Sequence, residues 1–274
     1  CISSAASDVY KRQQIPVCEK KILFVGEEIS FASRYRVEHF REQLHYQGYG
    51  SDFYQVDEVE DLDWDAYRAV VCYRCSREDV VRKVVEQAKK NGLNVYYDID
   101  DLIFDYERIS YLHFLTGSEY KDFKKTTEQI HSCMELCDGY FTSTDTLAGE
   151  IRREFPGKPV VINRNCASME MQILSHDAVE QVEKDPEHIF IGYFSGSKTH
   201  DQDFEVAEEA LLEVMKEHPE VRLKLVGVLS DRKMEKFGNK VEKLPFMDWK
   251  QLPSVMAGID INLMPLEDSI FHCS

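Results

Sequence analysis

The chain has 274 residues, of which 43% are hydrophobic, and this length exceeds that of the usual single domain. We therefore expect two domains, or one domain and part of another. Asp and Glu number 50 against 33 Lys and Arg, which gives a formal net charge of −17, and no long basic run offsets this charge locally. The composition argues against a nucleic-acid-binding protein.

The chain shows neither a membrane span nor a signal peptide. No apolar run approaches the length that crosses a bilayer, and the first residues lack the charged-then-apolar order of a secretion signal. A cytoplasmic protein is expected, with peripheral contact at the inner face of a membrane left open. Residues 1–17 lack core-forming periodicity and an initiating Met, and Asp8 to Gln13 resembles translated adaptor sequence. We interpret this segment as a non-native or disordered leader.

Eight cysteines are too dilute in this length for a disulfide scaffold, and in a reducing compartment they are thiols. The spacings Cys72-x-x-Cys75 and Cys133-x-x-x-Cys137 raise the alternative of a zinc site. However, Cys72 lies in an apolar strand pattern, Cys133 lies in a helical one, and no pair of histidines follows at zinc-finger spacing. No metal site is therefore expected.

The first half of the chain alternates strand and helix patterns, which predicts a parallel sheet. The expected strands are residues 21–26, 52–56, 69–73, 92–97, 138–143 and 158–162, and the expected helices are 34–47, 78–91, 109–137 and 144–155. Gly48 and Gly50 are expected to close the first helix, a break at Gly117-Ser118 is left open in the third, and Thr144 or Asp145 is expected to cap the fourth.

Two kinds of charged residue follow the carboxyl ends of these strands, where open α/β sheets bind ligands. Arg74 directly follows a strand and is a candidate to bind an anion, with pairing to a nearby acid as the alternative. Asp98, Asp100 and Asp101 form the densest acidic cluster, with Asp105 close behind. Because these carboxylates repel one another, at least one must hold a cation, a hydrogen-bond donor or a proton.

The acidic cluster has two interpretations that need no further context. One is a haloacid-dehalogenase-like phosphatase, with Asp98 as nucleophile, Asp100 as acid and base, and an obligatory magnesium ion. Leu102 departs from that motif, three strands precede it, and no later acidic pair completes a magnesium site. The other interpretation is that the carboxylates cap the next helix and face solvent.

The second half begins with a helical, acidic segment, residues 168–187, that we interpret as a linker. A strand at 189–194, a turn at 195–200, a helix with Asp201 and Asp203 at capping positions, and a strand at 221–227 follow. The apolar side of this helix is predicted from residues at helical spacing: Phe204, Ala207, Leu211, Leu212 and Met215. A helix at 250–257 and a strand at 259–264 come later. Gly196 and its flanking serines let a ligand approach the backbone before the helix. A phosphate-binding turn or an ordinary loop fits this pattern.

Four strings resemble the bacterial glycosyltransferases of family 4 (group 1): residues 192–204 (Gly-Tyr-Phe-Ser-Gly-Ser-Lys-Thr-His-Asp-Gln-Asp-Phe), 98–101, 247–253 and 260–266. This resemblance implies two Rossmann-like α/β domains in the GT-B arrangement. It also implies a nucleotide-diphosphate sugar bound by the C-terminal domain and a glycan, lipid-linked or other acceptor bound by the N-terminal one. Sugar transfer would proceed with retention at the anomeric carbon, with no metal or cofactor required.

The resemblance also assigns residues. The donor diphosphate would bind at Ser195, Gly196, Ser197, Lys198, Thr199 and His200, with Lys198 as the local cation. The catalytic acceptor side would carry Asp98, Asp100 and Asp101. The substrate cleft would include Arg34, Arg36, Arg74 and Asn165, with solvated arginines at a helix end as the alternative for the first two.

The implied division is an N-terminal acceptor domain at 18–167, the linker at 168–187, and a partial C-terminal donor domain at 188–274. The family's downstream segment, a helix with Lys-Ser-Glu and a distal glutamate, is absent. We therefore expect a truncated and inactive piece of a longer transferase. The rival interpretation is a GT-B relative that binds a nucleotide or a partner without turnover.

Overall fold

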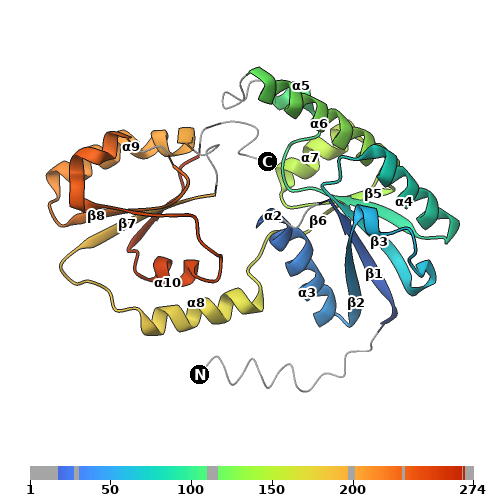
Figure 1. Cartoon of the computed structure of the whole chain (residues 1–274), viewed down its shortest axis with the longest axis horizontal. Coiled ribbons are helices and arrows are strands. Elements are labelled where there is room, and N and C mark those ends of the chain that lie inside the picture. Colours follow the sequence, from blue (N-terminus) through green and yellow to red (C-terminus); the bar gives the residue numbers. More distant parts are fainter. Residues whose placement is uncertain are drawn as a thin grey trace. The chain divides into compact units, whose positions relative to one another are not determined.

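The computed structural model describes residues 18–27, 31–109, 117–196, 201–229, 232–266 and 268. The chain divides into two compact units between Cys166 and Ala167, unit 1 before this point and unit 2 after it (Figure 1). Each unit contains a parallel β-sheet with helices packed against it, as the alternating patterns predicted. Residues 168–187, interpreted as a linker, begin unit 2.

Unit 1 is built on a six-stranded sheet whose strands pair in parallel in the order β2-β1-β3-β4-β5-β6. The chain places β2 on one side of β1 and every later strand on the other, so the connections that leave β1 and β3 diverge at their carboxyl ends. The strands are β1 (Cys18–Gly26), β2 (Tyr49–Gln55), β3 (Tyr67–Tyr73), β4 (Asn94–Asp98), β5 (Gly139–Thr142) and β6 (Val160–Ile162).

Helices cover both faces of this sheet. They are α2 (Phe31–Ser33), a π-helical turn (Arg34–Glu38), α3 (His39–Tyr46), α4 (Glu78–Lys90), α5 (Tyr106–Ile109), α6 (Gly117–Leu136) and α7 (Asp145–Glu154), with short 3-10 turns at Val56–Glu58 and Trp64–Ala66. Strand alternation decides which face each side chain joins. Tyr73 packs with Val37 and Phe24 on the face that α3 covers, whereas its neighbour Cys72 lies beside Cys137, directly after α6, on the other face.

Local predictions for unit 1 are correct in type and differ at some ends. The Thr144 hydroxyl caps α7 by accepting the Leu147 N–H at 3.1 Å, as expected. Gly48 ends the first helix with φ 81°, but Gly50 belongs to β2. Within the expected helix 109–137, α5 ends at Ile109 and α6 covers Gly117–Leu136, while residues 110–116 lie outside the described part.

Unit 2 is built on a four-stranded sheet with the parallel order β10-β7-β8-β9. Its elements are α8 (Met169–Gln181), β7 (Ile189–Ser195), α9 (Asp201–Glu217), β8 (Val221–Gly227), a 3-10 segment (Arg232–Lys240), β9 (Val241–Leu244), α10 (Leu252–Ala257) and β10 (Ile261–Leu263). The apolar side of α9 forms the core with β7 and β8, since Phe204, Leu211 and Met215 are buried against Ile191 and Leu223. This is the helical face that the sequence spacing predicted.

Among the described helices of either unit, we find none with the length and apolarity that a bilayer crossing requires.

Candidate functional site

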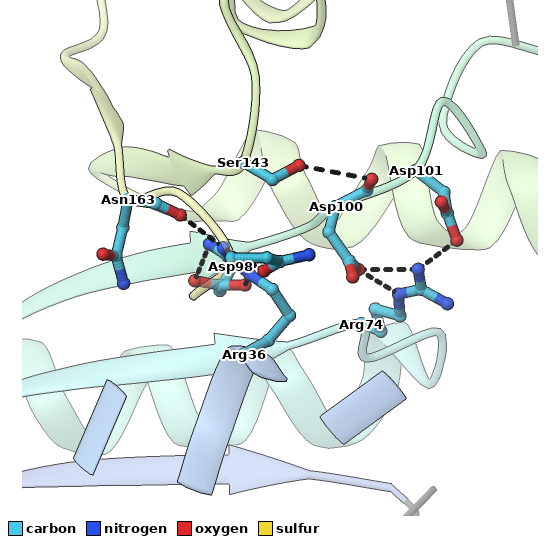
Figure 2. Close-up of polar contacts among 8 residues, drawn as sticks. Arg36, Arg74, Asp98, Asp100, Asp101, Ser143 and Asn163 are labelled. Carbon is cyan, nitrogen blue, oxygen red and sulfur yellow. Dashed lines mark hydrogen bonds and ion pairs between the residues drawn. The ribbon is translucent and has the colours of Figure 1, made fainter. Parts of the chain in front are cut away.

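In unit 1, the carboxyl ends of four neighbouring strands bring the predicted charged residues together. Asp98 is the last residue of β4, with Asp100 and Asp101 directly after it, and Arg74 directly follows β3. Ser143 and Asn163 follow β5 and β6. Parallel strands end at the same edge of a sheet, so residues far apart in sequence become neighbours there. Figure 2 shows these side chains at one edge, joined by Arg36 from the π-helical turn.

Arg36 and Asp98 form a buried, two-pronged ion pair. Arg36 Nε donates to Asp98 Oδ1 and Arg36 Nη2 to Asp98 Oδ2, both at 2.8 Å, and neither residue is exposed. Burial raises the pKa of Asp98 to about 6, against the opposing effect of the Arg36 guanidinium. The alternative of a solvated arginine is therefore wrong for Arg36. In this structure Arg36 binds groups of its own chain.

The remaining guanidinium nitrogen of Arg36, Nη1, binds the segment that follows β6. Nη1 donates to the carbonyl oxygen of Asn163 and, at 3.0 Å, to Oδ1 of Asn165 (Figure 2). Asn165, predicted in the cleft, thus joins the same cluster. Arg34, in the same π-helical turn, is half-buried and is not part of this network of Arg36 contacts.

Arg74 forms the second ion-pair group of the cluster. Its Nε donates to Asp100 Oδ1 at 2.8 Å, and its Nη2 also pairs with Asp101. Burial alone would lower the pKa of Arg74, but Asp100 and Asp101 outweigh burial and raise it. Arg74 is therefore paired with nearby acids, which was the alternative to anion binding. These pairs also confirm that the repelling carboxylates need cationic partners.

The backbone of Arg74 is strained. It is the one described residue other than glycine with a positive φ, 45°, a region that costs a residue with a Cβ roughly 1–2 kcal/mol. Its N–H donates to the Asp98 carbonyl oxygen at 3.1 Å, and its side chain holds two carboxylates. Such strain persists where surrounding contacts over-determine a conformation, and it is concentrated at functional sites.

Solvent reaches only the outer part of the cluster. The exposed fraction of the side chain is 45% for Asp101, 24% for Arg74 and 10% for Asp100, but only 1% for Asp98. Three carboxylates against two guanidinium groups leave one net negative charge. This edge suits a ligand that donates hydrogen bonds, such as a hydroxyl-rich molecule, better than it suits a phosphate.

Besides Ser143 and Asn163, two other residues near this edge were not predicted. Glu27, directly after β1, accepts the N–H groups of Ser76 at 2.5 Å and Arg77 at 2.7 Å, so its carboxylate occupies the amino end of α4. Its place after a strand, like that of Arg74, was a usable signal. His39 is buried and its Nδ1 lies 2.8 Å from the Cys166 carbonyl oxygen. Nothing local in the sequence indicated this contact.

In unit 2, the predicted phosphate turn begins at the end of β7. Ser195 is buried and Gly196 is exposed, and among the residues that the structure describes no atom lies within 4 Å of a Cβ added to Gly196. The neighbouring strand β8 ends at Gly227, which has φ 100° and packs so tightly that a Cβ there would overlap the Ser195 carbonyl oxygen. Ser197, Lys198, Thr199 and His200 lie outside the described residues.

The helix that follows this turn already carries acids at its amino end. Asp201 and Asp203 lie in the first turn of α9, and Asp203 is only 1% exposed. Carboxylates at this position interact favourably with the helix dipole. An incoming diphosphate would therefore depend on the N–H groups of the turn and on a nearby cation as well as on the helix end.

The cysteines of the zinc alternative also meet. Cys72, Cys75, Cys133 and Cys137 are buried free thiols. The Cys137 thiol lowers the pKa of Cys72, but the Cys75 thiol and burial raise it well above its ordinary value. Among the described residues, no group of three or more His, Cys, Asp or Glu side chains is arranged to hold a metal ion.

In unit 1, a cavity of about 530 Å³ lies beside α5, α6 and the end of α7. Its charged side chains are largely paired with one another, as Arg153 is with Asp105 at 2.5 Å and His131 with Glu154 at 3.0 Å. The described residues that line this cavity do not include Asp98, Asp100 or Asp101, so the cavity does not define the candidate site.

Comparison with known proteins identifies the fold. No family model matches the sequence, and no curated protein matches it. Among solved structures, the catalytic domain of starch synthase IV from Arabidopsis thaliana, bound to ADP and acarbose, has a TM-score of 0.58 and 9% identity, over 92% of this chain and 79% of that one. The fold is that of the GT-B glycosyltransferases.

Two further structures are similar. The UDP-forming α,α-trehalose-phosphate synthase from Burkholderia xenovorans has a TM-score of 0.51 and 10% identity, over 91% of this chain and 79% of that one. S. aureus TarM has a TM-score of 0.47 and 14% identity, over 76% of this chain, and the matched region spans 38% of the TarM chain. The two parallel sheets and the two structures with TM-scores above 0.5 confirm the predicted α/β fold class, while membership of family 4 stays a prediction.

Proposed function

We propose that this chain is part of a GT-B glycosyltransferase of the family 4 type. Unit 2 would bind a nucleotide-diphosphate sugar, and unit 1 would bind a glycan or lipid-linked acceptor. Similar folds belong to a starch synthase domain solved with ADP and to a UDP-forming trehalose-phosphate synthase. The observation that carries the proposal is the open backbone turn Ser195-Gly196 at the end of β7.

The donor side of the proposal depends on backbone chemistry. No atom of the described residues occupies the position that a side chain at Gly196 would take, so a ligand can approach the backbone there. Gly227 lets β8 approach the Ser195 carbonyl, which fixes the base of the turn. Backbone N–H groups in such a turn bind the oxygens of a diphosphate and stabilise its charge as the sugar departs. Lys198 would supply the cation, and retention at the anomeric carbon is part of the same proposal.

The acceptor side depends on the acidic cluster. Asp100 and Asp101 reach solvent and carry the excess negative charge, so they would accept hydrogen bonds from acceptor hydroxyls. Asp98 is buried under Arg36 and would act by positioning the strand end rather than by touching substrate. A lipid-linked acceptor would bring the chain to a membrane surface.

The geometry disfavours the phosphatase alternative. A nucleophilic Asp98 must reach its substrate, yet both of its oxygens bind Arg36 and its side chain is 1% exposed. A module that binds a nucleotide sugar without transferring it would share the Ser195-Gly196 turn. Only an assay of turnover distinguishes that module from a transferase.

The test is calorimetric titration of the chain with UDP, ADP and their glucose conjugates, with Gly196→Val and Gly196→Ala as a matched pair. We expect wild type to bind a nucleotide diphosphate, Gly196→Val to lose binding, and both variants to keep the wild-type melting temperature, because the space is open. Equal binding by Gly196→Val would refute the donor site. Release of the nucleoside diphosphate only in the presence of an oligosaccharide would identify transfer, and binding without release would favour the module.

A further inference from the structure

Residues 163–166, the last of unit 1, are held by three side chains from the π-helical turn and α3. Arg36 Nη1 donates to the carbonyl oxygen of Asn163 and to the side chain of Asn165. His39 Nδ1 lies 2.8 Å from the carbonyl oxygen of Cys166, and because a carbonyl only accepts, Nδ1 carries the proton. Gln43 Nε2 lies 3.0 Å from Cys166 Sγ.

These contacts reach deep into unit 1. Arg36 is fully buried and is fixed in turn by both oxygens of Asp98, and His39 is 3% exposed. The Asn163 N–H also donates to the Thr142 carbonyl oxygen at 2.7 Å. Groups that are buried and hydrogen-bonded on several sides move little, so Arg36 and His39 attach this segment to unit 1 although Arg164, Asn165 and Cys166 are themselves exposed.

Unit 2 begins almost immediately afterwards. The Ser168 hydroxyl caps α8 by accepting the Met171 N–H at 3.1 Å, and Ser168 is buried. Helix α8 is tied to the rest of unit 2 by Glu170, which pairs with Lys250 at 2.7 Å. Lys184, just beyond α8, donates to the Ile259 carbonyl oxygen at 3.0 Å.

We propose that Arg36, His39 and Gln43 anchor residues 163–166 to unit 1, so that Ala167 is the pivot of this connection between the two units. Ala167 is exposed and is the single residue between the anchored Cys166 and the helix cap Ser168, and its carbonyl oxygen accepts from Gln172 Nε2 of α8 at 3.4 Å. A pivot of one residue allows rotation about few backbone bonds. Loss of all the anchoring contacts would lengthen the free connection to five residues, 163–167. This device does not depend on whether the chain transfers sugar.

Trypsin cleavage after Arg164 tests the anchor. A protease needs several residues around the cleaved bond in an extended, detached form, and Asn163, Asn165 and Cys166 are all held here. We expect His39→Phe, which keeps the ring and removes the donor, to speed appearance of the peptide end at Arg164 by up to about tenfold, the effect of one net hydrogen bond. His39→Asn, which keeps a donor nitrogen near Nδ1, should stay near the wild-type rate.

The matched control is His45→Phe, an exposed position on the same helix, which should leave the cleavage rate unchanged. Melting temperatures close to wild type would show that His39→Phe is folded. Equal cleavage rates in folded His39→Phe and wild type would overturn the anchor, and so would equal acceleration by His39→Asn.

Backbone ¹⁵N–¹H heteronuclear NOE values on the whole chain test the pivot. In wild type we expect a reduced value at Ala167 and rigid values at residues 164–166, and in His39→Phe, where Arg36 still holds Asn163 and Asn165, we expect the reduced values to extend back to Cys166. Reduced values through 164–166 in wild type would refute the anchor. Rigid values at Ala167 in wild type would refute the pivot.

Discussion

The guanidinium of Arg36 and the carboxylate of Asp98 meet in a two-pronged ion pair with both N–O distances at 2.8 Å and no exposure to solvent. The two residues lie 62 positions apart, one in a π-helical turn and the other at the end of β4. Through its remaining nitrogen, Arg36 also holds the segment after β6. One side chain therefore joins three separate stretches of unit 1.

Removal of Arg36 alone should be strongly destabilising. In Arg36→Met the Asp98 carboxylate remains buried without its partner, and such a loss typically costs 3–5 kcal/mol, so we expect the free energy of unfolding of unit 1 to fall by about 4 kcal/mol. The double variant Arg36→Met with Asp98→Leu should recover most of this loss, because no buried charge remains. Urea denaturation measures both, and additive losses in the double variant would contradict the expected coupling.

Asp98 should make stability depend on pH in an unusual direction. Burial raises its pKa in the folded chain to about 6, above its unfolded value, so the folded state binds the proton more tightly. The contribution of Asp98 is therefore greatest at low pH and is lost as pH rises from about 4 to about 6. We expect the stability of wild type relative to Asp98→Asn to fall by up to about 3 kcal/mol across this window.

The measurement is the free energy of unfolding of wild type and Asp98→Asn from denaturant titrations at pH 4, 5, 6 and 7. The Asp98→Asn chain is the reference because it cannot titrate at this position, and both chains share the remaining carboxylates. A difference that rises with pH would show that the ion pair with Arg36, rather than burial, controls the proton affinity of Asp98.

Asp100→Asn should separate the two substrate sites. Asp100 lies in unit 1 and the Ser195-Gly196 turn lies in unit 2. The Asn side chain loses a charged hydrogen bond to an acceptor hydroxyl, so the transfer rate should fall about tenfold to a hundredfold. The affinity for the donor should stay unchanged. In a catalytically competent chain, steady-state kinetics measure the transfer rate, and titration with the nucleotide measures the donor affinity. An equal loss of donor affinity would move the cluster to the nucleotide side, and the exposed Asp63→Asn is the control.

Gly227→Ala should destabilise unit 2 selectively. The added Cβ would overlap the Ser195 carbonyl oxygen at a backbone with φ 100°, and strain of this kind costs about 1–3 kcal/mol even before the clash is relieved. The two tryptophans report each unit separately, since Trp64 lies in unit 1 and Trp249 in unit 2. In a Trp64→Phe background the unfolding midpoint should drop for Gly227→Ala and not for Gly196→Ala. Equal midpoints would show that β7 and β8 can separate there.

Local sequence patterns determined the type and order of most elements. Apolar runs and helical spacing depend on neighbours within about one to four residues, so they predicted β1, the apolar face of α9 and the Thr144 cap without knowledge of the fold. Carboxylate repulsion is also local, and for that reason the sequence already required a partner for the cluster that begins at Asp98. The sequence predicted the ends of the strands and the start of α6 less accurately, because strand pairing and packing against the rest of the fold set these bounds.

Tertiary structure alone decided which partners meet. Nothing within a few residues of Asp98 indicates Arg36, and nothing near His39 indicates Cys166, because 62 and 127 residues separate these pairs. Only the parallel sheet, which gathers the ends of β3, β4, β5 and β6 at one edge, brings them together. The same sheet made Arg36 a buried structural group instead of a solvated one, because exposure depends on what the folded chain places above a side chain and not on the residue type.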